Sequence, residues 1–154
     1  MIRKSHTAAA ALLLTSVIAA APASATPSCH TRIGTVSIEI FTDSTCLSAV
    51  GLCAKVQFRG GLRAESDFVG TSLTPSVDVA STGIVFLTGD NHIRTRHGDL
   101  FVKDAIVFNT TGEAEFSEVD TIVGGTGLYE GATGRLQAVG KNNEGVYTVE
   151  ICTP

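Results

Sequence analysis

Short runs of β-favouring residues alternate with clusters of turn residues along the chain after residue 26, and this rhythm admits few folds. No run has the 3.6-residue period of an amphipathic helix, and glycine, threonine and valine recur throughout. Strands at this spacing with no helix between them predict an all-β fold, either an antiparallel sandwich or a barrel. The expected strands cover residues 33–41, 54–59, 84–88, 100–108, 114–123, 135–140 and 146–151, and the turn clusters cover 42–44, 60–61, 89–91, 109–112 and 142–145.

Residues 70–81 form the least regular stretch of the chain. Pro75 lies within it, and proline cannot donate the backbone hydrogen bond that a central strand requires. We therefore expect a mobile loop or lid in this stretch rather than a strand.

Residues 1–25 have the organisation of a secretory signal peptide. Arg3 and Lys4 precede an apolar run of about 14 residues, and the small-x-small pattern at 23–25 is typical of a cleavage site. A membrane-spanning helix needs about 20 apolar residues, so the run is too short for an anchor. We expect cleavage at the end of this leader, export to the extracellular space or the cell envelope, and a single domain over residues 26–154.

The part of the chain expected to be exported is acidic. The full sequence has 11 Lys and Arg residues against 15 Asp and Glu residues, and the leader contains two of the basic residues and none of the acidic ones. Its removal leaves nine basic and 15 acidic residues, a net charge of about −6. Without a basic patch we expect no binding to nucleic acid, and no later segment is apolar enough to span a bilayer.

All four cysteines lie in this exported part, where an even number usually forms disulfides. Three pairings are possible, and we favour Cys29 with Cys152, which would join the two ends of the domain, and Cys46 with Cys53. The last two are seven residues apart, which is outside the spacing of a zinc-binding pair, and His30 has no spaced partner. We therefore expect two disulfides and no metal site.

The sequence GGTGLYEGATGRLQAVG at residues 124–140 is rich in glycine. A dinucleotide-binding fingerprint would need a third glycine where Glu130 stands, and a P-loop would need a Lys-Ser or Lys-Thr ending that the stretch lacks. Glycines further along would also cost a following helix about 1 kcal/mol each. The stretch therefore predicts the turns of a closing sheet, with five structural turn residues: Gly124, Gly125, Gly127, Gly131 and Gly134.

The segment GGTGLYEGATG resembles the signature GG[TS]G-aromatic-x-GA-x-G of the allene oxide cyclase-like and dirigent-like barrels, and of the small bacterial secreted domains related to them. The segment that carries the resemblance is 11 residues long, and the strand rhythm of the rest of the chain is compatible with it. The resemblance implies a single antiparallel, calycin-like barrel of eight strands with a mostly apolar cavity, often assembled as a homodimer or homotrimer. Members of the superfamily cyclise oxidised lipids or direct phenoxy-radical coupling, generally without a metal or an organic cofactor.

The resemblance also implies a site residue. Allene oxide cyclases use a carboxylate on the first barrel strand, and Glu39 in SIEIF is the match. Because side chains alternate along a strand, Ile38 and Ile40 would point to the opposite face from Glu39. Glu39 is therefore either a catalytic group on the inside or a solvated surface acid. Plant dirigent proteins typically have an arginine where this chain has Thr133, so the chain departs from the radical-coupling pattern.

The segment GDNHIRTRHGD offers a second candidate site. On a strand, alternation would place Asp90, His92 and Arg94 on one face. Histidine titrates near neutral pH and arginine binds carboxylates at two points, so Asp90 and His92 could be catalytic and Arg94 could bind a ligand. The alternative is the charged outer face of a hairpin. Tyr129 and Tyr147 could add hydroxyl groups to a ligand pocket, or cap the core with the hydroxyl in water.

These features predict a secreted, disulfide-stabilised barrel that binds a small apolar molecule or cyclises it as a cofactor-free isomerase. In the catalytic version, Glu39 or Asp90 together with His92 supplies charge inside the cavity. The alternatives are a hydrophobic-ligand carrier without such groups, and an extracellular interaction domain with a filled interior. Four large side chains could fill that interior and leave no room for a ligand: Phe86, Phe101, Phe108 and Phe116.

Overall fold

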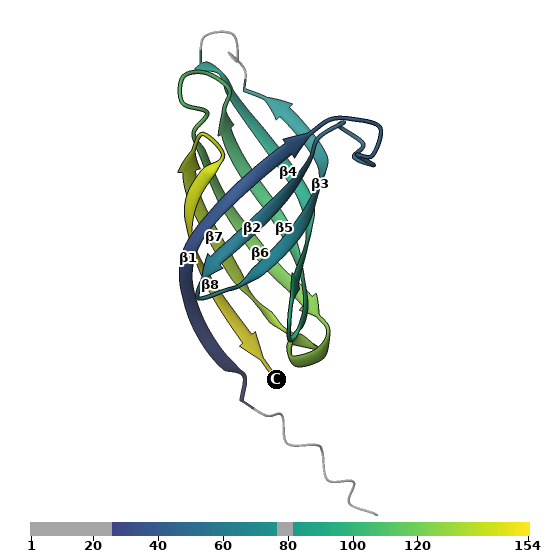
Figure 1. Ribbon diagram of the computed structural model, residues 1–154, viewed down its shortest axis with the longest axis vertical. Helices are drawn as coiled ribbons and strands as arrows, with labels where there is room; N and C mark the ends of the chain where they lie inside the picture. The colour runs from purple at the N-terminus through teal and green to yellow at the C-terminus, as the bar shows by residue number, and fades with distance from the viewer. Residues whose placement is uncertain (1–25, 77–81) are drawn as a thin grey trace, which may run out of the picture.

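The computed structural model describes residues 26–76 and 82–154. Eight antiparallel strands close into one barrel, in which each strand pairs with the next in sequence and the last pairs with the first (Figure 1). The predicted all-β antiparallel barrel is therefore confirmed. In the described part of the chain, no helix has the length and apolar character needed to cross a membrane. The elements are β1 (Ser28–Phe41), β2 (Cys53–Gly60), β3 (Ala64–Pro75), β4 (Ile84–Thr95), β5 (Gly98–Asn109), β6 (Phe116–Gly125), a one-turn 3₁₀ helix η1 (Gly127–Tyr129), β7 (Thr133–Lys141) and β8 (Glu144–Thr153).

The prediction of a loop over residues 70–81 is wrong for residues 70–75. Residues 70–75 complete β3, and Pro75 is the last residue of that strand, opposite Val85. The pairing of β3 with β2 ends at Val69, so Pro75 has a strand on one side only. Proline is tolerated at such an edge position, which is why it ends the strand without excluding it. Residues 77–81 lie outside the described residues.

The turn predicted at residues 89–91 is also wrong, because these residues lie in the middle of β4. Gly89 is buried there against the ring of Phe68, and a Cβ atom at this position would collide with the ring. The glycine serves close packing inside the barrel rather than a change of chain direction.

Both predicted disulfides are present. Cys29 and Cys152 are directly opposite each other on β1 and β8, so their bond joins the two strands that close the barrel. The bond between Cys46 and Cys53 fastens the loop at 42–52 to the first residue of β2. Two disulfides are typical of proteins from oxidising compartments. The predicted signal peptide lies outside the described residues.

The glycine-rich stretch forms turns, but not at every predicted position. Gly127 and Gly131 have φ angles of 61° and 70°, in the left-handed region that favours glycine, on either side of a tight connection. Gly134 also has a positive φ where β7 begins. In contrast, Gly124 and Gly125 lie in β6 opposite β5 and have no positive φ. The bend therefore begins after Gly125, and neither of these two glycines is part of it.

One end of the barrel is filled, and we call it the packed end. It carries the loops at 61–63, 96–97 and 126–132, and it is where β1 begins and β8 ends (Figure 1). Tyr147 is 2% exposed there and meets Phe58 edge-on, with ring centroids 5.3 Å apart. The aromatic pair belongs to a cluster of buried apolar side chains that also includes Leu62, Leu100, Leu136, Val149 and Ile151.

Candidate functional site

A cavity lies toward the opposite end of the barrel, which carries the loops at 42–52, 110–115 and 142–143 and which we call the cavity end. The cavity offers about 60 Å³ to the centres of water-sized molecules. One water needs roughly 10–15 Å³ on this measure, so the space holds a few waters or part of a slender molecule. Its walls are mainly apolar side chains, including Ile40, Ala54, Phe68, Leu87, Phe108 and Phe116.

Three carboxyl groups point into the barrel from adjacent strands. Alternation turns Asp104 inward on β5 in phase with buried Leu100, and turns Glu118 and Asp120 inward on β6. Asp104 and Asp120 are 4% and 2% exposed, and Glu118 is partly buried. Asp104 and Glu118 line the cavity, while Asp120 lies two residues further along β6 toward the packed end. We call these three residues the acid cluster.

Hydrogen bonds hold part of the acid cluster in place. The Nδ2 atom of Asn91, on β4, donates to Oδ2 of Asp104 at 3.0 Å, and the backbone N–H of Ala105 donates to Oδ1 of Asp120 at 3.4 Å. Oδ1 of Asn91 and Oδ1 of Asp104 are both buried, and neither has a hydrogen-bond partner among the described residues. A buried polar atom left without a partner costs about 1–3 kcal/mol. Asn91 and Asp104 therefore present two unsatisfied oxygens at the cavity.

No cation of the barrel balances these carboxyls, because every Lys and Arg in residues 26–76 and 82–154 is exposed. Within the same residues, no group of three or more His, Cys, Asp and Glu side chains could hold a metal ion. The site thus combines buried acids with no visible counter-charge, which is costly unless the acids keep their protons.

Burial raises the pKa of each carboxyl in the cluster. The pKa of Asp104 rises to about 7, through burial and then repulsion from nearby Asp90. The pKa of Glu118 rises to about 8, through burial and then repulsion from Asp104. The pKa of Asp120 rises to about 10, through burial and then repulsion from the other two acids. Near neutral pH the cluster therefore keeps most of its protons.

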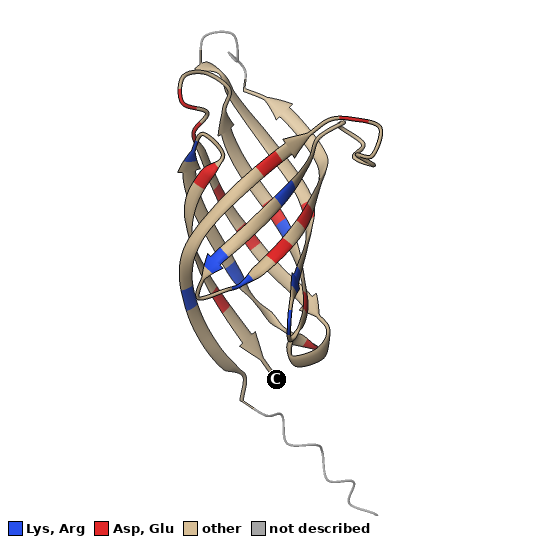
Figure 2. Cartoon of the chain, in the orientation of Figure 1, with Lys and Arg blue, Asp and Glu red and all other residues tan. Residues whose placement is uncertain are grey.

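Two of the predicted catalytic residues lie on the outer surface. Glu39 is exposed on β1, because Val36 and Ile38 occupy the inward positions around it, so the surface alternative is the one that the structure has. Asp90 is exposed on β4 and forms an ion pair with Lys103. Acidic and basic residues of this kind alternate across the outer face of β1, β2 and β3 (Figure 2). Neither acid therefore occupies the position inside the cavity that the catalytic alternative requires.

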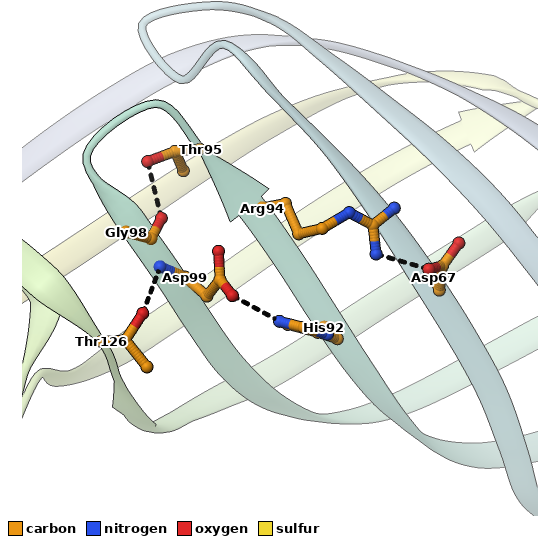
Figure 3. A network of polar contacts seen from close by, with 7 residues as sticks. All are labelled: Asp67, His92, Arg94, Thr95, Gly98, Asp99 and Thr126. Carbon is orange, nitrogen blue, oxygen red and sulfur yellow. Dashed lines mark hydrogen bonds and ion pairs between the residues drawn. The ribbon is translucent and has the colours of Figure 1, made fainter.

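His92 and Arg94 also belong to this outer face, on β4. Nε2 of His92 lies 2.9 Å from Oδ2 of Asp99, and Arg94 forms an ion pair with Asp67 (Figure 3). The hydrogen bond from Arg94 lowers the pKa of Asp67. The two pairs join β4 to β5 and to β3. Exposed pairs of this kind contribute about 0–1 kcal/mol, so they form a modest brace on the charged outer face and do not line the cavity.

The predicted ligand-binding tyrosines both lie at the packed end. The hydroxyl of Tyr147 accepts a hydrogen bond from the Leu62 N–H at 2.7 Å and donates one to the Leu62 carbonyl at 3.1 Å. Burial raises the pKa of this hydroxyl, which keeps its proton available for the second bond. Tyr129, in η1, packs against the core. Tyr147 is therefore a structural residue, and neither tyrosine lines the cavity.

Of the four phenylalanines that could fill the interior, two point into the barrel and two lie on its outer surface. Phe108 and Phe116 line the cavity, whereas Phe86 and Phe101 are 49% and 40% exposed on the outside. The barrel centre is therefore only partly filled at the cavity end.

The acid cluster was not among the predicted site residues, although the sequence holds a signal for part of it. Asp104 is in phase with Leu100, Val102, Ile106 and Phe108, so a single acid interrupts an otherwise apolar face. Glu118 and Asp120 give no such signal. The opposite face of β6 also mixes polar residues with valines, so alternation does not tell the inside from the outside.

The cavity and the acid cluster together form the candidate site. Its walls are mostly apolar, and Asn91, Asp104 and Glu118 place polar groups on adjacent strands of the same cavity, so the site can hold an apolar group that carries a polar group. In comparisons with known proteins, no family model, no curated protein and no solved structure matches this chain.

Proposed function

We propose that the chain is a secreted barrel that binds a small, mostly apolar molecule in the cavity. The observation that carries the proposal is the cavity lining, in which most side chains are apolar and Asn91, Asp104 and Glu118 add polar groups from the adjacent strands β4, β5 and β6. Sites for small molecules typically combine apolar walls with a few placed polar groups that fix the orientation of the ligand.

The dimensions of the cavity favour a slender ligand. Its volume of about 60 Å³ lies well below the roughly 300–1,000 Å³ of sites that enclose drug-sized molecules. A straight chain or a single small ring that enters end-on fits this space, whereas a fused ring system does not. The ligand is thus held along the barrel axis, with its outer end near Ile40 at the mouth.

The proposal includes export and the superfamily. The basic, apolar and small-residue segments of the leader favour secretion, and the two disulfides suit an oxidising compartment. The glycine motif and the eight-stranded barrel together support a place among the allene oxide cyclase-like and dirigent-like barrels.

A second candidate function is that of an isomerase or cyclase acting on an apolar substrate. The observation in its favour is that burial keeps carboxyl groups protonated near neutral pH beside an apolar cavity. Such a group can donate a proton to a substrate that water would not protonate. In this version Asp104 or Glu118 is the acid, in place of the outward-facing residues that the sequence suggests.

A blocked cavity mouth tests the binding proposal. Ile40 lines the cavity and is 40% exposed, so Ile40→Trp should narrow the mouth without disturbing the packed end. Wild-type protein should bind 1-octanol in calorimetry, and native mass spectrometry of exported protein should show a bound apolar molecule. We expect the variant to bind 1-octanol at least about tenfold more weakly, a loss of roughly 1.4 kcal/mol.

The matched control is Val146→Trp, which places the same large side chain at a position that is 56% exposed on the outside of β8. It should bind 1-octanol like the wild type. Equal binding by the Ile40 variant and the wild type, or no binding to the wild type at all, would contradict the proposal.

A further inference from the structure

We infer that the ligand carries an ammonium group at its inner end, so that a slender alkyl amine lies with its nitrogen among Asn91, Asp104 and Glu118 and its chain toward the cavity mouth. The inference rests on the proposed binding function and names the chemical class of the ligand. Hydrogen bonding, charge and shape each support it.

The unsatisfied atoms at the inner end call for a hydrogen-bond donor. Asn91 uses its Nδ2 atom on Asp104, which leaves its Oδ1, a pure acceptor, without a partner in the described part of the protein. Oδ1 of Asp104 is also buried and has no hydrogen-bond partner among the described residues. An ammonium group has three N–H donors and no acceptor, so it can satisfy both oxygens and a carboxylate oxygen of Glu118 together. A ligand carbonyl or ether would meet Asn91 Oδ1 with another acceptor.

The charge of the site selects against anions. Three carboxyls lie close together on β5 and β6, and the basic residues that the structure describes all lie outside the barrel. Above about pH 8, where Asp104 and Glu118 lose their protons, a ligand carboxylate or phosphate would add repulsion in a medium that screens it poorly. An ammonium group supplies the missing positive charge, so its own desolvation is offset by direct pairing with the acids.

The shape of the cavity selects a primary amine on a chain. The apolar walls between Phe108 and Ala54 match methylene groups, and the small volume excludes a bulky substituent on nitrogen. A guanidinium is larger and planar, whereas an ammonium is compact and can turn its three donors toward oxygens on different strands. The nitrogen therefore points inward and the chain fills the path to Ile40.

Binding should be linked to proton release. The pKa values of Asp104 and Glu118 are raised to about 7 and about 8, and a cation beside them favours the ionised forms. The neighbouring strands face the cluster with Asn91 on β4 and Leu136 on β7, neither of which titrates, while Asp90 adds repulsion from outside. The affinity for an alkyl amine should rise from pH 6 to pH 9, still below the usual amine pKa of about 10.4. The affinity for an alcohol should not change.

Three probes of equal chain length test the inference: octylamine, 1-octanol and octanoate, titrated into the mature protein by calorimetry at pH 8. We expect octylamine to bind at least about tenfold more tightly than 1-octanol, and octanoate to bind more weakly than either. Repetition in two buffers of different ionisation enthalpy should show protons released with the amine and none with the alcohol.

Variants locate the amine at the acid cluster. Glu118→Gln and Asp104→Asn keep the size of each side chain and remove its charge, so the preference for octylamine over 1-octanol should fall below about threefold while 1-octanol still binds. Glu65→Gln makes the same change at an exposed position on the outer face of β3, and it should leave the preference intact.

Each outcome separates this inference from the proposed function. Equal affinity for octylamine and 1-octanol overturns the inference and leaves the apolar binding site standing. A preference for the amine that survives both cluster variants places the ammonium elsewhere and also overturns it. Failure of all three probes to bind the wild-type protein removes the proposed function together with the inference.

Discussion

At the scale of single residues, Tyr147 closes the packed end by replacing a backbone partner. Its hydroxyl accepts from the N–H of Leu62 and donates to the carbonyl of the same residue, 85 positions away in sequence. Leu62 lies in the short connection between β2 and β3, where no strand can satisfy these groups. The tyrosine hydroxyl thus satisfies backbone hydrogen-bonding groups at the barrel end, as a neighbouring strand does along the barrel wall.

Tyr147→Phe should therefore destabilise the protein without a change of fold. The variant keeps the ring against Phe58 but leaves the N–H and carbonyl of Leu62 buried without a partner. Each such group costs about 1–3 kcal/mol, so for the two groups we expect a loss of roughly 2 to 6 kcal/mol in the free energy of unfolding. Urea denaturation followed by circular dichroism measures it. Tyr129→Phe, which removes a hydroxyl from a partly buried ring at the same end, is the control; a larger loss in the control would refute this role for Tyr147.

At the scale of elements, the sequence predicts seven of the eight strands, and there is a physical reason why it does not predict the eighth. Strand β3 was missed because its inward positions carry Ser66, Phe68 and Gly70, which do not form an apolar face, and because Pro75 ends it. The sequence draws attention to Glu39 on β1 and to the charged run on β4, and these residues lie on the outer face. The buried acids lie instead on β6 and on the apolar face of β5. A closed barrel tolerates such acids because they can remain protonated.

The two disulfides should differ in what they contribute, because they close loops of very different length. Cys29 and Cys152 are 123 positions apart, and Cys46 and Cys53 are seven apart. The chain-entropy model gives about 5 kcal/mol for the first bond and about 2.5 kcal/mol for the second. The double variant Cys29→Ser, Cys152→Ser should therefore lower the Tm by more than Cys46→Ser, Cys53→Ser, as scanning calorimetry would show. The reverse order would mean that the loop at 42–52 supports the barrel more than its closing strands do.

At the scale of the whole molecule, the barrel separates stability from binding along its axis. The packed end holds most of the large buried core around Tyr147, and both closing strands are joined there by a disulfide. The cavity end has fewer buried apolar residues and gives up part of its interior volume to the site. Placing uncompensated acids between these two regions costs folding free energy. Functional sites in proteins commonly lower stability in this way.

This cost should appear in the pH dependence of unfolding. Between the ordinary carboxyl pKa near 4 and the raised values of about 7 to 10, the folded protein holds protons that the unfolded chain has released. Stability from the cluster is therefore fully present at low pH and falls as pH rises, by up to about 1.4 kcal/mol per pH unit for each carboxyl. Asp67, whose pKa is lowered, acts in the opposite sense, but only below about pH 4.

Asp120→Asn isolates the largest part of this dependence, since Asp120 has the highest pKa of the three and lies deepest. The amide oxygen can still accept from the Ala105 N–H, so the variant should be more stable than the wild type at pH 8 by a few kcal/mol, with the difference shrinking toward pH 5. Urea titrations at half-unit steps from pH 5 to pH 9 measure the curve. Glu65→Gln, exposed on β3, should run parallel to the wild type, and an Asp120→Asn curve parallel to both would mean that Asp120 is ionised in the folded barrel.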